Sequence, residues 1–168
     1  MIEKAGFGGG CHWCTEAVFA SLRGVERVEQ GWIAPAGDET EYFSEAVIVH
    51  FDPAKIPLDI LVEIHLRTHN ATSDHSMREK YRSAVYTFSR EQHEEVEAIL
   101  RQQAPLFDTP LVTKVYPFGA FRPNSEKYQN YYAKNPQKPF CQRYIEPKLT
   151  MLLAEYGAYY TSTPKKES

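Results

Sequence analysis

The sequence GGGCHWC occupies residues 8–14, between a predicted strand at residues 3–8 and a predicted helix from about residue 11 to residue 23. It places two cysteines, Cys11 and Cys14, at the start of that helix. A cysteine there faces unpaired backbone N–H groups and the positive end of the helix dipole, which favours the nucleophilic thiolate. The glycines allow a tight turn that leaves the sulfur uncovered. The segment therefore predicts a reactive thiol, although its spacing also suits a zinc site or two inert core cysteines.

Outward from this segment, predicted strands and helices alternate loosely with short connections. Further strands are predicted at residues 25–33, 45–51, 82–88 and 111–116, and further helices at residues 57–69, 90–103, 125–134 and 144–156. The strand at residues 45–51 is largely apolar on both faces, which is typical of a central strand. Ser89 and Gln92 form a capping box for the helix at residues 90–103. The pattern predicts a sheet covered by helices, of class α+β or α/β.

The composition indicates one folded domain without a nucleic-acid or membrane partner. Of the 168 residues, 42% are hydrophobic, which is enough for a real core. We expect a single domain over residues 1–160 and a short disordered tail over residues 161–168. The net charge of −3 includes no long run of one sign. No signal peptide or membrane-spanning run is evident, so we expect a cytoplasmic monomer whose three cysteines serve redox or nucleophilic chemistry.

Five blocks of the chain resemble, in the same order, those of the methionine sulfoxide reductase A family. They are GCHWC at residues 10–14, SEAV at 44–47, YRSAVY at 81–86, the segment from FRP to KNP at 121–136, and the segment from FC to PK at 140–148. The resemblance implies an α+β two-layer sandwich with a ferredoxin-like core, in which helices cover a mixed sheet. It also implies reduction of methionine (S)-sulfoxide, free or in proteins, with thioredoxin as electron donor and without a cofactor.

The same resemblance implies a role for individual residues. Cys11 is the nucleophile that attacks the sulfoxide sulfur. Glu45 is the acid that protonates the departing oxygen, and burial at the start of an apolar strand would favour its protonated form. Tyr81 is expected to donate a hydrogen bond to the sulfoxide oxygen. Trp13 is expected to hold the methyl group of the substrate.

The chain departs from the family pattern at several positions, which suggests a divergent branch. His12 stands where the family usually has Phe, and it adds to the substrate pocket a group that titrates near neutral pH. A protonated His12 would lower the pKa of Cys11, whereas a neutral one could donate to the oxygen. Ser76 stands where Asp is usual, and Tyr42 is the nearest counterpart of a second family tyrosine that binds substrate.

Reduction of the sulfoxide leaves a sulfenic acid on Cys11, which condenses with a second thiol to form a disulfide. Cys14 is one helical turn away, whereas Cys141 lies in the segment where the family often carries its resolving cysteine. We favour Cys141 from the resemblance, and Cys14 or a relay through both stays open. Thioredoxin would then reduce the disulfide.

Three other functions stay open on the sequence alone. The first is a thioredoxin-like dithiol oxidoreductase, although in such enzymes the tryptophan normally precedes the first cysteine. The second is a structural zinc module built from Cys11, Cys14, Cys141 and a histidine such as His75. The third is a sulfoxide-binding protein without turnover, which the serine at position 76 keeps open.

Overall fold

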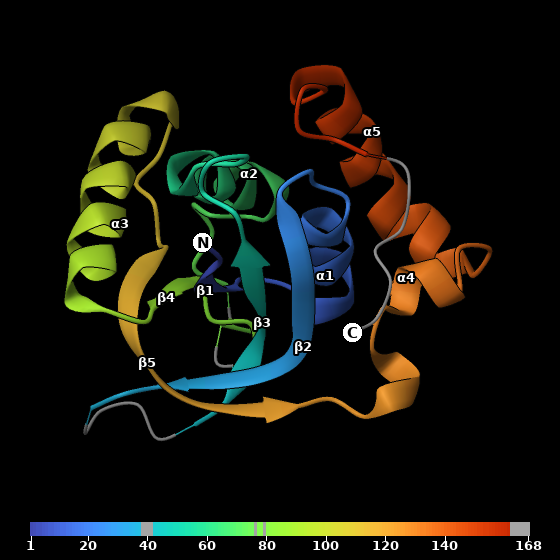
Figure 1. Ribbon diagram of the computed structural model, residues 1–168, viewed down its shortest axis with the longest axis horizontal. Helices are drawn as coiled ribbons and strands as arrows, with labels where there is room; N and C mark the ends of the chain where they lie inside the picture. Colours follow the sequence, from blue (N-terminus) through green and yellow to red (C-terminus); the bar gives the residue numbers. More distant parts are fainter. Residues whose placement is uncertain (38–41, 76, 79, 162–168) are drawn as a thin grey trace.

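Within residues 1–37, 42–75, 77–78 and 80–161, which the computed structural model describes, five strands close into a barrel (Figure 1). Around the barrel their order is β1-β3-β2-β5-β4. Neighbouring strands are antiparallel, except that β4 and β5 are parallel. The strands are β1 (Glu3–Gly8), β2 (Val25–Pro35), β3 (Ser44–Phe51), β4 (Ala84–Thr87) and β5 (Lys114–Pro123).

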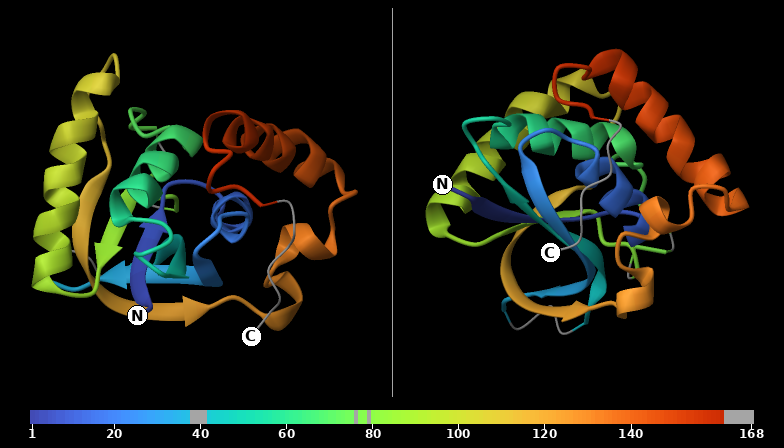
Figure 2. Two further views of the ribbon diagram at one scale, coloured as in Figure 1. Left: turned by 45° about the horizontal axis from the view of Figure 1, so that its top comes forward. Right: turned by 45° about the vertical axis from the view of Figure 1, so that its right-hand side comes forward.

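Helices cover the barrel on one side and extend beyond it (Figures 1 and 2). They are α1 (His12–Ala20), α2 (Leu58–Thr68), α3 (Arg90–Gln103), α4 (Tyr131–Lys134) and α5 (Glu146–Glu155), and a π-helical turn (Cys141–Ile145) leads into α5. The α3 helix lies along β4 and β5 at one end of the molecule, while α4 and α5 lie at the other end (Figure 1). The α1 helix packs against β2 and β3 and also contacts α4. The start of α1 therefore lies between the barrel and the C-terminal helices.

Two hydrophobic clusters fill the fold, and β3 contributes to both because its side chains alternate in direction. Val47, Val49 and Phe51 join the large cluster between the barrel and the helices. Ala46 and Ile48 join a small cluster that faces the barrel interior. Since β3 pairs with both β1 and β2, its predicted central position is confirmed.

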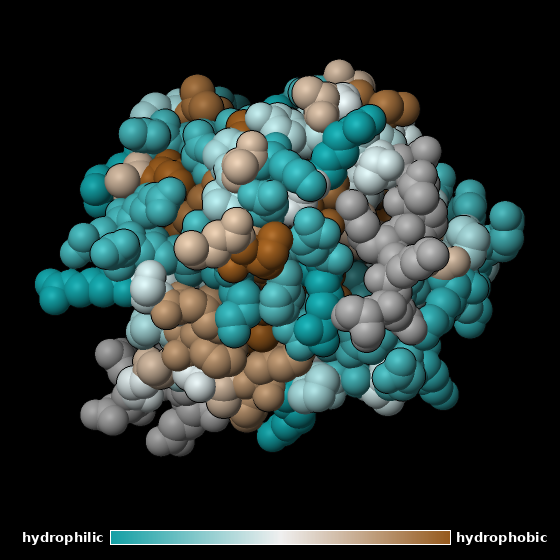
Figure 3. All heavy atoms as spheres, in the orientation of Figure 1, coloured by the Kyte–Doolittle hydropathy of each residue, from teal (hydrophilic) through white to brown (hydrophobic). Residues whose placement is uncertain are grey.

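The inner cluster also explains the apolar patch on the molecular surface. Partly buried aromatic side chains of β5 pack against this cluster. In the orientation of Figure 1, the visible surface is mostly hydrophilic, apart from an apolar patch over β5 (Figure 3). The patch is thus the outer margin of a small core inside the barrel.

The predicted elements agree best with the structure where local signals are strong. The bounds of β1 and α3 are as predicted, and Oγ of Ser89 caps α3 by accepting a hydrogen bond from the backbone N of Gln92 (3.1 Å). The strand expected at residues 111–116 is wrong in its bounds, because β5 runs from residue 114 to residue 123. The helix predicted at residues 125–134 is broken into a 3-10 turn and the short α4, whereas the helix predicted at residues 144–156 is confirmed as α5 (Glu146–Glu155).

The mixed sheet covered by helices is confirmed, whereas the ferredoxin-like sandwich is not, because the strands close into a barrel. The single domain over residues 1–160 stays a prediction. Ser76 and residues 162–168 of the expected tail lie outside the described residues. In the part of the chain that is described, no helix has the length and apolar character needed to cross a membrane.

Candidate active site

Cys11 lies at the N-cap of α1, where the chain leaves the glycine turn that follows β1. Its carbonyl oxygen accepts hydrogen bonds from the backbone N of Cys14 (3.1 Å) and of Thr15 (3.2 Å), which start the helix. The turn requires glycine at position 9, because an added Cβ would lie 2.4 Å from Cδ2 of His69. Close packing of this turn against α2 therefore fixes the point at which Cys11 enters the helix.

The surroundings of Cys11 favour its thiolate, as the sequence predicts. A hydrogen bond from the Cys14 side chain is the main cause that lowers the pKa of Cys11, and the backbone N–H groups of Trp13 and Cys14 add to it. Burial and the charge of Glu45 oppose this shift. The same hydrogen bond, together with burial, raises the pKa of Cys14. The pair thus consists of Cys11, whose pKa is lowered, and a protonated Cys14 that serves as its donor.

Cys11 and Cys14 open onto a cavity of about 320 Å³. The cavity lies between the start of α1, the end of α2 with the residues that follow it, and the C-terminal segment. Its lining includes Cys11, Cys14, Thr15, His65, His69, His75, Tyr81, Phe140, Tyr144 and Lys148. Cys11 and Tyr81 therefore share one cavity.

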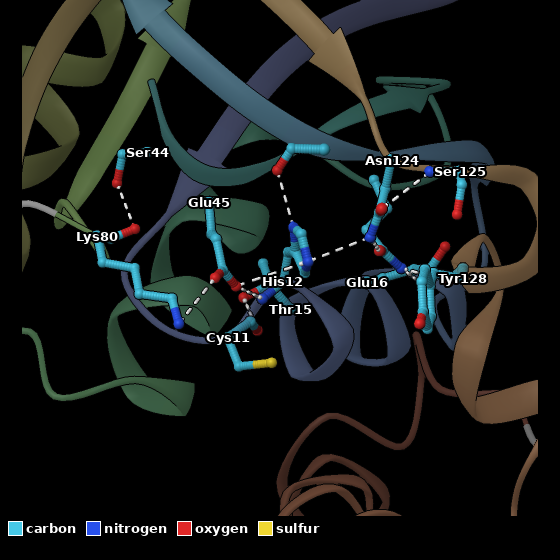
Figure 4. A network of polar contacts seen from close by, with 12 residues as sticks. Cys11, His12, Thr15, Glu16, Ser44, Glu45, Lys80, Asn124, Ser125 and Tyr128 are labelled. Carbon is cyan, nitrogen blue, oxygen red and sulfur yellow. Dashed lines mark hydrogen bonds and ion pairs between the residues drawn. The ribbon is translucent and has the colours of Figure 1, made fainter. Parts of the chain in front are cut away.

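Glu45 approaches the start of α1 from the barrel (Figure 4). It is the second residue of β3, and it is only 7% exposed. Its Oε1 accepts a hydrogen bond from the backbone N of His12 (3.1 Å), and its Oε2 lies 3.7 Å from Nζ of Lys80. Glu45 lies near Cys11 and is not among the residues that line the cavity.

His12 is buried and is already engaged by the protein. Its Nδ1 lies 2.8 Å from the carbonyl oxygen of Gly31 and carries the hydrogen, since a carbonyl can only accept. Burial is the main cause that lowers the pKa of His12. Its Nε2 lies 3.6 Å from Oε1 of Glu45 and 3.4 Å from Nδ2 of Asn124. His12 is therefore neutral and faces Glu45 and Asn124, and it is not among the residues that line the cavity.

Trp13 and Tyr42 also lie outside the cavity lining. The Trp13 ring stacks on Tyr131, with ring centroids 4.0 Å apart, and meets Phe140 edge to face. Its Nε1 is buried and has no hydrogen-bond partner among the described residues. Tyr42 is about half exposed, and the guanidinium of Arg82 lies 4.8 Å from its ring centroid. Both aromatic rings thus pack against neighbours in this structure.

Cys141 is fully buried in the π-helical turn, and all three cysteines are free thiols. Burial raises the pKa of Cys141. A negative charge on Cys141 would in turn raise the pKa of Cys14, so the two sulfurs are near each other. Across the described residues, no group of three His, Cys, Asp or Glu side chains could hold a metal ion, which leaves the zinc module without support.

Sequence reasoning missed a polar network that joins the start of α1 to the C-terminal segment (Figure 4). Asn124 donates to Oε1 of Gln30 (2.7 Å), and Gln30 donates to Oε1 of Glu16 (2.8 Å). The buried Glu16 carboxylate also accepts the backbone N–H groups of Asn130 (2.7 Å) and Tyr131 (3.0 Å). An acidic residue among the apolar positions of α1 was the available signal. The network holds the C-terminal segment against the helix that carries Cys11.

A second missed residue is Lys80, which lies in a polar loop without any local signal. Its ammonium group is near Glu45 and lies 5.1 Å from the ring centroid of Tyr81. Interactions with Tyr81, Glu45 and Cys11 raise the pKa of Lys80. It is thus a common neighbour of three residues that the sequence assigned to catalysis.

Comparisons with known proteins find relatives over nearly the whole chain. The family model described as peptide methionine sulfoxide reductase matches residues 3–159. The chain is 35% identical to the peptide methionine sulfoxide reductase MsrA of Chromobacterium violaceum, in an alignment that covers 93% of this chain and 97% of that protein.

Solved structures show the same fold. Mxr1 from Saccharomyces cerevisiae in its reduced form has a TM-score of 0.71 at 23% identity, over 83% of this chain and 89% of that chain. Mxr1 in complex with Trx2 has a TM-score of 0.62 at 20% identity, over 75% of this chain and 82% of that chain. With the match over residues 3–159, these findings establish that the chain belongs to the peptide methionine sulfoxide reductase family.

Proposed function

We propose that this chain reduces methionine (S)-sulfoxide to methionine through a sulfenic acid on Cys11. Membership of the family makes the chain an oxidoreductase that acts on methionine sulfoxide in peptides. The observation that carries the assignment to Cys11 is its place at the N-cap of α1, where Cys14 lowers its pKa and the cavity gives access to it. A lowered pKa increases the fraction of the nucleophilic thiolate.

The reduction step uses three groups around that sulfur. The Cys11 thiolate attacks the sulfoxide sulfur, while Glu45 gives a proton to the oxygen and Tyr81 donates a hydrogen bond to it. The products are methionine, a sulfenic acid on Cys11 and an ionised Glu45. Glu45 lies at the same helix start as Cys11, and Tyr81 shares the cavity with it. Hydrogen bonds of this kind often shorten only when substrate binds.

We infer that Cys14 is the first thiol to meet the sulfenic acid, because its side chain already contacts Cys11. Attack by Cys14 on the Cys11 sulfur releases water and forms a disulfide. Cys141, which the resemblance favours, is buried but lies near Cys14. A relay in which Cys141 then exchanges with Cys14 would move the disulfide away from the nucleophile.

Regeneration of the dithiol requires an external reductant, and we propose thioredoxin. The likeness to Mxr1, whose structure has been solved in complex with Trx2, supports this choice. We further propose that the chain acts as a cytoplasmic monomer. In this structure other residues of the protein contact the side chains of His12, Trp13 and Tyr42. These three side chains would contact substrate as proposed only if binding displaces those residues. Two of the three belong to the GCHWC segment, which departs from the family pattern.

The test is turnover of each epimer of methionine sulfoxide with dithiothreitol and with thioredoxin, for the wild type, Cys11→Ser and Glu45→Gln. We expect the S epimer alone to be reduced, Cys11→Ser to be inactive, and Glu45→Gln to lose kcat with little change in KM. Without reductant, one methionine should form per chain while the free thiols fall from three to one. Substantial activity of Cys11→Ser would overturn the mechanism, and insulin reduction without sulfoxide turnover would favour a dithiol oxidoreductase.

A further inference from the structure

The backbone around Lys80 is fixed to the start of β3. Its carbonyl oxygen accepts hydrogen bonds from the backbone N of Glu45 (3.0 Å) and from Oγ of Ser44 (2.8 Å). Oγ of Ser44 in turn accepts a hydrogen bond from the backbone N of Arg82 (2.7 Å). These bonds tie the residues on both sides of Tyr81 to the strand that carries Glu45. The side chain of Lys80 therefore starts from a fixed point beside the acid.

The ammonium group of Lys80 lies over the site of the reduction step (Figure 4). Nζ is 3.7 Å from Oε2 of Glu45, whereas Oε1 of the same carboxyl group is held by the backbone N of His12. The Glu45 side chain is 9% exposed and that of Lys80 is 55% exposed, so a cation on the solvent side covers a buried carboxyl group. Lys80 is thus placed to respond to any change of charge on Glu45.

We propose that Lys80 assists the reduction step by stabilising the carboxylate that Glu45 becomes when its proton passes to the sulfoxide oxygen. The inference rests on the proposed function, in which Glu45 is the acid. In that step the Cys11 thiolate is oxidised to a sulfenic acid, the sulfoxide is reduced to a thioether, and the proton of Glu45 ends on the transferred oxygen. Lys80 changes no bond and acts through Glu45, so it is a positioning residue.

A cation beside the acid has an effect on the rate that can be measured. It lowers the energy of the carboxylate as the proton leaves, which speeds the step. Among the described residues, the other titratable groups near Lys80 are Tyr81, Cys11 and His12. Burial lowers the pKa of His12, so the negative charges that Lys80 meets are those of Glu45 and of a Cys11 thiolate.

Lys80→Met removes the charge and keeps most of the side-chain length. Single-turnover methionine formation, divided by the thiolate fraction of Cys11 from alkylation rates, should fall about twofold to fivefold, since the pair is partly exposed. Lys80→Arg should restore this rate, because it restores the positive charge.

The matched control is Lys55→Met, because Lys55 is an exposed lysine that follows the opposite end of β3 from Glu45. It should leave the rate unchanged. An unchanged single-turnover rate in Lys80→Met, with Glu45→Gln slow, would overturn the role of Lys80 alone. A normal rate in Glu45→Gln would overturn both the acid assignment and the role of Lys80. A fall in rate in Lys80→Met that Lys80→Arg does not reverse would also overturn the proposal.

Discussion

The hydrogen bond from Cys14 to Cys11 can be removed by one substitution, Cys14→Ala. It is the main cause that lowers the pKa of Cys11. A hydrogen bond to a charged group contributes about 1.5–3 kcal/mol, and a thiol is a weak donor. Both sulfurs also line the cavity, so water can replace part of the lost hydrogen bond to the Cys11 thiolate. We therefore take about 1.4 kcal/mol for the free energy by which Cys14→Ala destabilises the thiolate. The thiolate fraction of Cys11 below its pKa should then fall about tenfold.

The assay is the rate at which iodoacetamide alkylates Cys11 between about pH 5 and pH 8, followed by mass spectrometry of the peptide that contains residue 11. The pH at which the rate is half maximal reports the pKa of Cys11, whereas the absolute rate also depends on how easily iodoacetamide reaches the sulfur. Cys14→Ser keeps a donor at the same place and should shift this pH less than Cys14→Ala. Cys141→Ser removes a buried thiol elsewhere and should leave it unchanged. An identical profile for Cys14→Ala and the wild type would refute the thiolate–donor pair.

Three further predictions concern the parts of the fold that hold the site. Glu16→Ala removes the acceptor of the buried backbone N–H of Tyr131 and of the part-buried one of Asn130, and should lower the free energy of unfolding in urea by about 3 kcal/mol; a loss below about 1 kcal/mol would contradict the network. Gly9→Ala should reduce both stability and turnover because its Cβ would meet the ring of His69, whereas Gly10→Ala, with no atom within 4 Å of its Cβ, should behave like the wild type. Burial lowers the pKa of His65 to about 4, below its unfolded value, so the unfolded chain binds the extra proton first. Stability should therefore fall by up to about 3 kcal/mol as pH drops from about 6.5 to about 4, and His65→Asn should flatten this dependence in urea titrations.

The elements that could be predicted are those whose signals are local. β1 is short, and the glycines that follow it mark its end, while α3 begins at a serine that caps it through its side chain. The alternation in β3 correctly indicated a central strand, because both of its faces are apolar. In each of these cases neighbouring residues alone determine the backbone. Closure of the barrel is different, since the parallel pairing of β4 with β5 depends on residues about thirty positions apart.

The same distinction explains which residues of the proposed site could be named from the sequence. Cys11 could be named because a helix start and a neighbouring thiol favour a thiolate. The roles of Glu45 and Tyr81 came from the family resemblance, since a single carboxyl or phenol carries no local signal of function. Neither source indicated Lys80, whose position depends on hydrogen bonds between its carbonyl oxygen and the start of β3.

Backbone hydrogen bonds around Lys80 also hold Glu45 in place. Trp32 of β2 pairs with Glu45, and the backbone N of Glu45 binds the carbonyl oxygen of Lys80. The pairing with Trp32 therefore holds Glu45 in the sheet. The hydrogen bond from the backbone N of Glu45 in turn holds the loop that carries Lys80. Substitutions that leave these backbone bonds intact can change the side chains around the thiolate without moving the acid. A polar ring at position 12 is one such change, because its Nδ1 hydrogen bond to Gly31 attaches it to β2, the strand that pairs with β3 at Glu45.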